Sequence, residues 1–197
     1  MCWSAEGSLQ TYAFGMILAA IHKYQGDLDP RVWLLMIVFT QMQLVEYFLW
    51  KNLKTSATNR LWSGVGMALV LVQPLISATL LNPDLRNKLW TVYLLGVTSY
   101  FLTRKVDVTT EVGGNGHLKW NWITSFKSPW TIAWLLMFVG PLLVTGHEAA
   151  TVFIVATYFA SSYFNDKYGT AGSYWCWFSI SMWMLSFDWP RLTRQII

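Results

Sequence analysis

Long apolar runs separated by short polar segments make up most of this chain. A helix rises about 1.5 Å per residue, so roughly 20 apolar residues cross the ~30 Å hydrocarbon core of a bilayer. The runs predict about seven transmembrane helices in one domain, over residues 7–23, 31–51, 61–82, 88–104, 129–146, 148–165 and 169–189. The first and fourth runs reach this length only if flanking Lys and Arg side chains extend to the surface, so five or six spans remain an alternative.

One connection, residues 106–123, has a different pattern. Beta-branched residues lead into a Gly-Gly-Asn-Gly segment, after which Leu118, Trp120 and Trp122 alternate with polar residues. This alternation predicts a β-hairpin outside the membrane, and its apolar face should fold back onto the helices. The alternative is an irregular loop with chance alternation.

Composition agrees with a membrane location, because 54% of the residues are hydrophobic and only 12% are charged. Soluble domains have about 25% charged residues. The predicted fold class is therefore an all-α integral membrane protein. The basic residues lie between the apolar runs and form no stripe, so the net charge of +4 predicts no nucleic-acid partner. Their slight excess on the side of the N-terminus nominally places that terminus in the cytoplasm.

The second apolar run contains a carboxylate, Glu46, with Gln43 one turn earlier on the same helical face. A charged group at the centre of a membrane helix costs roughly 3 kcal/mol or more, so such a residue usually has a partner or a function. Glu46 could instead be solvated near the interface, or paired with Lys51 or Arg104.

Counting from the tryptophans at the helix ends places several polar residues in the same membrane half. We expect a polar cavity there, formed by Glu46, Gln43, Gln73, Gln10 and Ser173. Tyr174, Trp175 and Trp177 would form an aromatic wall for a ligand, and Trp120 and Trp122 of the hairpin would cap the cavity. The alternative for each Gln and Ser is an ordinary hydrogen bond between helices.

Two prolines lie inside predicted helices, Pro74 and Pro141. A proline cannot donate to the carbonyl four residues earlier, so we expect free carbonyls at Val70 and Met137.

Catalytic signatures are weak in this sequence. The three histidines are scattered, no pair has zinc-helix spacing, and the two cysteines form no cluster. No enzyme activity, metal or cofactor is predicted.

Three short motifs together resemble an uncharacterised family of seven-helix membrane proteins found in microbes and large DNA viruses. They are Met42-Gln43-x-x-Glu46-Tyr47, Gln73-Pro74 and Trp175-Cys176-Trp177. The resemblance implies a seven-helix fold in which Gln43, Glu46, Gln73 and Pro74 belong to one shared feature. It implies no established activity.

Three functions fit these observations. The first is transport of protons, ions or a small solute along the polar residues, with Glu46 as the charged group. The second is binding or sensing of a small amphiphilic ligand or lipid between the second, third and seventh helices. The third is a structural role through lateral assembly into a homo-oligomer, using small residues such as Ala156 and Ala160. In each case the lipid bilayer is the expected environment.

Overall fold

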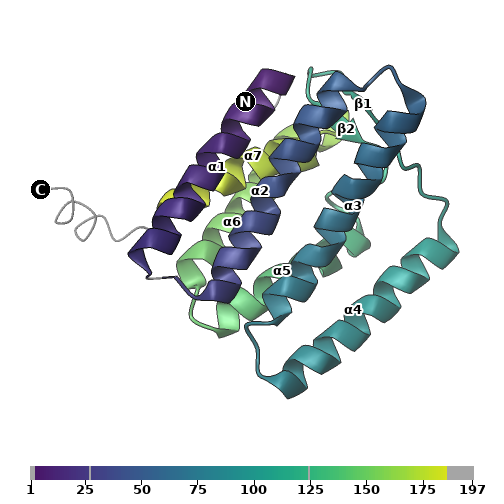
Figure 1. Ribbon diagram of the computed structural model, residues 1–197. Coiled ribbons are helices and arrows are strands. Elements are labelled where there is room, and N and C mark those ends of the chain that lie inside the picture. The colour runs from purple at the N-terminus through teal and green to yellow at the C-terminus, as the bar shows by residue number, and fades with distance from the viewer. Residues whose placement is uncertain (1–2, 27, 124, 186–197) are drawn as a thin grey trace, which may run out of the picture.

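The computed structural model describes residues 3–26, 28–123 and 125–185 (Figure 1). Within these ranges the chain forms seven α-helices and one two-stranded antiparallel sheet. The elements are α1 (Ala5–Gln25), α2 (Pro30–Lys51), α3 (Ser56–Ala78), α4 (Pro83–Thr103), β1 (Thr110–Val112), β2 (Leu118–Trp120), α5 (Pro129–Val144), α6 (Glu148–Asn165), a short 3-10 turn η1 (Asp166–Tyr168) and α7 (Ala171–Leu185).

The helices form two layers. Helices α1, α2 and α3 lie side by side, with α4 beyond α3 at the outer edge, and α5, α6 and α7 lie behind them (Figure 1). Helices α1 and α2 approach closely at Gly15, where an added Cβ would lie only 2.6 Å from the Thr40 methyl group. The N-terminal end of α1 lies beside the hairpin, since the rings of Trp3 and His117 are in edge contact at 5.4 Å.

The predicted seven helices and the two-stranded sheet are confirmed, whereas the bounds of two helices differ by several residues. Helix α3 begins at Ser56 and ends at Ala78, and α4 begins at Pro83. The Asn82 side chain caps α4 by accepting from the Leu85 amide at 3.0 Å, and Pro83 suits a first turn. The prediction placed both starts too late because charged residues end an apolar run without ending a helix. Residues 186–189 of the predicted seventh span lie outside the described residues.

Fewer helices than the predicted seven spans meet a length and composition criterion for crossing a membrane. Within the described residues, α2 and α3 are the two helices that are long and apolar enough to cross a bilayer by these criteria.

The hairpin joins the two layers. The Asn59 amide of α3 pairs with the Thr110 backbone, donating to its carbonyl at 2.9 Å and accepting from its amide at 3.0 Å. At the tip, Asn115 Nδ2 donates to Thr170 Oγ1 at 2.8 Å and to Asn165 Oδ1 at 3.1 Å. The hairpin therefore bridges the start of α3 and the junction between α6 and α7.

The apolar face of the hairpin is buried, as predicted. Leu118, Trp120 and Trp122 are each at most 5% exposed, and the two indoles stack at 5.0 Å. Gly172 of α7 makes this possible, since an added Cβ there would lie 2.7 Å from the Trp120 ring.

Helices α3 and α5 each hydrogen-bond a carbonyl near the other's proline. Trp134 Nε1 donates to the Val70 carbonyl at 2.9 Å, which is the carbonyl predicted to be free because of Pro74. In the other direction, the buried Ser77 hydroxyl donates at 2.6 Å to the carbonyl of Phe138, the residue after Met137. These reciprocal bonds fix α5 against α3.

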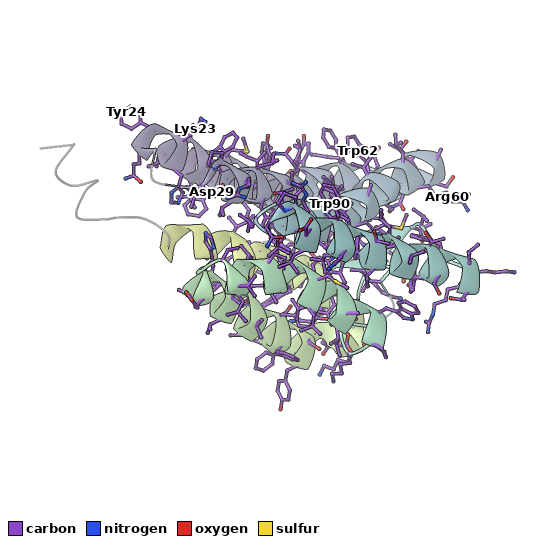
Figure 2. The ribbon with its side chains drawn as sticks, turned by 90° about the horizontal axis from the view of Figure 1, so that it is seen from below. Lys23, Tyr24, Asp29, Arg60, Trp62 and Trp90 are labelled. Atoms are coloured by element: carbon purple, nitrogen blue, oxygen red, sulfur yellow. The ribbon has the colours of Figure 1, made fainter. Side chains whose placement is uncertain are left out.

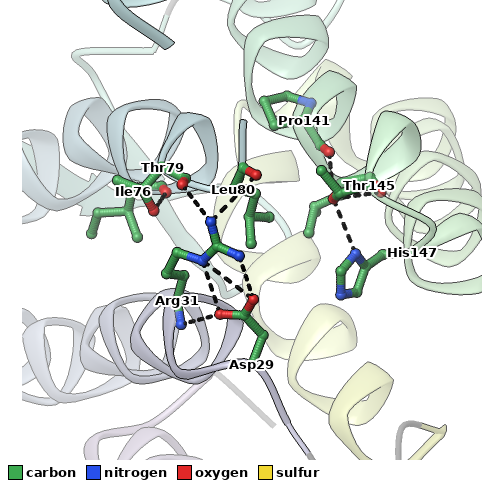
Figure 3. Close-up of polar contacts among 9 residues, drawn as sticks. Asp29, Arg31, Ile76, Thr79, Leu80, Pro141, Thr145 and His147 are labelled. Atoms are coloured by element: carbon green, nitrogen blue, oxygen red, sulfur yellow. Dashed lines mark hydrogen bonds and ion pairs between the residues drawn. The ribbon is translucent and has the colours of Figure 1, made fainter. Parts of the chain in front are cut away.

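At the opposite end from the hairpin, Arg31 links the start of α2 to the end of α3 (Figure 3). Its Nη1 donates to the Thr79 carbonyl at 3.0 Å and the Leu80 carbonyl at 3.4 Å, while its Nη2 is 2.6 Å from Asp29 Oδ2. Hydrogen bonding from Arg31 holds the pKa of the Asp29 carboxyl below its ordinary value.

This shift predicts a pH-dependent stability. Because the folded-state pKa of Asp29 is lowered, its contribution is present above the unfolded-state value of about 3.9 and is lost as pH falls through the folded value. We expect acidification from pH 6 to pH 3 to lower the thermal unfolding midpoint more in the wild type than in Asp29→Asn. The difference should not exceed about 1 kcal/mol, since the pair is solvent-exposed. An equal fall in both proteins would contradict the assignment.

Candidate functional site

A cavity of about 270 Å³ lies between α3, α4 and α5, beneath the hairpin. Its walls are almost entirely apolar or aromatic. Residues from each surrounding element include Val70 and Leu71 of α3, Tyr93, Gly96 and Tyr100 of α4, Trp120 and Trp122 of the hairpin region, and Trp134 and Met137 of α5. Tyr158 of α6 and Trp175 and Cys176 of α7 form its floor.

Two aromatic side chains of α4 hold it against α3. Tyr93 donates its hydroxyl to the Leu71 carbonyl at 2.8 Å, and Trp90 Nε1 donates to the Leu75 carbonyl at 2.9 Å. Tyr93 is the one buried residue of α4, and Trp90 is labelled on this helix in Figure 2. Because these large rings lie between the backbones of α3 and α4, the two helices are held apart and a space remains beside α4.

The floor is a packed aromatic cluster centred on Trp175, which is 3% exposed. Its ring makes edge contacts with Phe39 at 5.4 Å and with Trp134 and Tyr158 at 5.7 Å each. Its Nε1 donates to the Ile154 carbonyl at 3.3 Å. Such edge-to-face contacts add about 0.5–1.5 kcal/mol each beyond burial, so this wall is well packed.

The cavity opens sideways, on the outer surface of the helices. Val92 and Phe101 of α4 belong to its lining and are 57% and 38% exposed, and Ala133 of α5 is also an exposed lining residue. The opening therefore lies between α4 and α5.

Most of the predicted polar residues are buried, although they do not line this cavity. Glu46, Gln43 and Ser173 are 0% exposed and Gln73 is 1% exposed. Gln10 is different, because it lies on the exposed face of α1. The structure therefore does not bring Gln10 together with the others.

Packing places three of the buried oxygen-bearing residues at one depth. Gly15 of α1 meets Thr40 of α2 and Ile180 of α7. Ser8, Glu46 and Ser173 lie on these same three helices, each about two turns closer to the hairpin than Gly15, Thr40 and Ile180. All three are 0% exposed. Ser173 belongs to α7, as do Trp175 and Cys176 of the cavity floor.

Three of the five aromatic residues that were predicted to form a ligand wall or a cap line the cavity, and two do not. Trp175, Trp120 and Trp122 line the cavity. Tyr174 instead contacts the His117 ring at 5.3 Å, and Trp177 contacts Phe178 at 4.9 Å. The cavity lies between α3, α4 and α5, whereas the sequence predicted a ligand between the second, third and seventh helices. The predicted ligand place stays a prediction.

Sequence reasoning missed the residues of α4 and α5 that form the walls, chiefly Tyr93, Gly96 and Trp134. The free carbonyl expected at Val70 was a usable signal, since a buried carbonyl needs a donor. Nothing in the sequence indicated which aromatic donor would reach it.

Comparison with family models, curated proteins and solved structures finds no match to this chain. The seven-helix family resemblance thus remains a prediction.

Proposed function

We propose that this is an integral membrane protein whose side cavity binds one apolar chain of a bilayer lipid. The observation that carries the proposal is the aromatic-lined cavity that opens between α4 and α5. The chain would enter from the surrounding bilayer through this opening. The protein would act as a lipid-binding or lipid-sensing module.

The distribution of side chains supports a membrane location. Leu95 and Leu102 of α4 and Val152 of α6 are 67%, 82% and 66% exposed, whereas Glu46 and Gln43 are fully buried. Exposing apolar surface to water costs about 25 cal/mol per Å², and soluble proteins rarely expose large contiguous apolar patches. In a bilayer the same outward-facing residues would be in a favourable solvent.

The shape and chemistry of the cavity favour a hydrocarbon chain. Its lining along α4 extends from Val92 to Phe101, which corresponds to roughly 14 Å along the helix. A volume of about 270 Å³ lies just below the usual range of ligand pockets, which begins near ~300 Å³. The cavity therefore suits part of a single chain better than a complete two-chain lipid.

Transport, the first function predicted from the sequence, stays a prediction. Its central residues, Glu46, Gln43 and Gln73, are absent from the cavity lining. Lateral assembly likewise stays a prediction. The geometry supports binding best, because it offers a formed space of matching chemistry.

Photo-cross-linking tests the proposal directly. The protein is reconstituted in phosphatidylcholine vesicles containing phosphatidylcholine with a photoactivatable diazirine in its acyl chain, and cross-linked peptides are mapped by mass spectrometry. We expect enrichment at lining residues such as Tyr93 and Met137 over the exposed Ile17 of α1. Uniform labelling of all outward apolar positions would overturn the cavity proposal. Release of the protein from native membranes by alkaline carbonate would overturn the membrane location.

A further inference from the structure

The cavity has a polar mouth at the end that faces the hairpin. Tyr100 of α4 and Trp130 of α5 line the cavity there, with their rings in edge contact at 5.4 Å. The guanidinium of Arg104 lies 5.8 Å from the centre of the Tyr100 ring. Lys127 directly precedes Ser128, another lining residue, and both basic residues are exposed. Arg104 therefore lies at the mouth, and Lys127 is an exposed residue between the lining residues Phe126 and Ser128.

The carboxylates at this end are already engaged. Asp166 accepts from the Ser125 hydroxyl at 2.8 Å and the Phe126 amide at 2.9 Å, and Asp107 accepts from Thr109 at 2.8 Å. Glu111 pairs with Lys119 at 2.7 Å, and Glu6 with Lys51 at 3.5 Å. Across the described ranges, no carboxylate forms an ion pair with Arg104 or Lys127. Positive charge at the mouth is therefore available to an external anion.

We propose that the cavity selects an anionic phospholipid, with its phosphate held by Arg104 and Lys127 at the mouth and one acyl chain lying in the cavity. This inference rests on the proposed function and adds the headgroup to it. A guanidinium can donate two parallel hydrogen bonds to a phosphate, and the Tyr100 ring limits the positions Arg104 occupies. The position of Arg104 at the end of α4 agrees with a phosphate contact, because basic side chains at helix ends extend to the headgroup level.

Net charge distinguishes anionic from zwitterionic lipids at this mouth. Phosphatidylcholine also carries a phosphate, but its own quaternary ammonium offsets the charge. Each Lys or Arg near an anionic surface contributes about 1 kcal/mol, so losing one cation should change the preference about fivefold. The preference should weaken in high salt, because exposed charges are screened.

The test uses vesicles of equal parts phosphatidylcholine and phosphatidylglycerol, with the photoactivatable chain on one lipid or the other. We expect phosphatidylglycerol to label the cavity lining at least about fivefold more than phosphatidylcholine does. Arg104→Gln should lower the ratio of phosphatidylglycerol to phosphatidylcholine labelling about fivefold while phosphatidylcholine labelling persists. Arg60→Gln is the matched control, because Arg60 is exposed at the same end, on α3 and outside the lining (Figure 2).

The outcomes distinguish the two proposals. Equal labelling of the cavity by both lipids in the wild type would overturn the anionic preference and leave chain binding intact. No enrichment at the cavity with either lipid would overturn chain binding itself. If millimolar glycerol phosphate removed the preference, the mouth would bind a soluble anion, and the lipid assignment would be wrong. An unchanged unfolding midpoint in Arg104→Gln checks that the fold is retained.

Discussion

Gly96→Leu should remove lipid cross-linking from the cavity while leaving the protein folded. Gly96 lines the cavity, and an added Cβ at this position meets no atom within 4 Å. A leucine side chain would therefore enter the space that the acyl chain is proposed to fill. We expect cross-linking at Tyr93 and Met137 to fall about tenfold, which corresponds to about 1.4 kcal/mol of binding free energy.

The same substitution should not destabilise the helix, since glycine in a helix interior costs about 0.8–1 kcal/mol relative to alanine. Gly140→Leu is the matched control, because an added Cβ at Gly140 of α5 also meets nothing within 4 Å, yet Gly140 is not in the lining. It should retain wild-type cross-linking. Full cross-linking in a folded Gly96→Leu variant would contradict the account.

Trp175→Ala should cause the largest loss of stability. The indole is almost fully buried and packs against Phe39, Trp134 and Tyr158, so its removal leaves a void in both layers of the bundle. Truncation of a buried tryptophan costs about 3–5 kcal/mol, and we expect a loss in that range for unfolding in detergent micelles.

Trp177→Ala provides the comparison for this second prediction. Trp177 is two residues away on α7, is only partly buried and lies outside the cavity lining. We expect its truncation to cost less than half as much as that of Trp175. Equal losses would show that Trp175 is not the centre of the packing.

The helices and the hairpin could be read from the sequence because their signals are local. Apolar runs and capping residues define helices, and alternation at Leu118, Trp120 and Trp122 defines a strand with one buried face. The helix boundaries were predicted less accurately than the helices themselves. Helix α4 starts at Pro83 because Asn82 caps it, and a count of uncharged residues does not include such a cap.

The cavity could not be placed from the sequence because its position depends on how far α4 stands from α3. That spacing comes from Trp90 and Tyr93 reaching carbonyls near Pro74, which is a long-range contact. Depth along each span could be estimated by counting residues. Which side of each helix faces the bundle could not be predicted. Gln10 is an example, because it lies on the outside although its depth matches that of the buried polar residues.

The central claim is that a lipid chain occupies the space beside Tyr93 and Gly96. A cryo-electron microscopy map of the protein in lipid nanodiscs tests it most directly. We predict continuous elongated density that enters between α4 and α5 and passes along Trp122 toward the cavity floor. A cavity closed by contact between α4 and α5, or one holding only isolated water density, would contradict the claim.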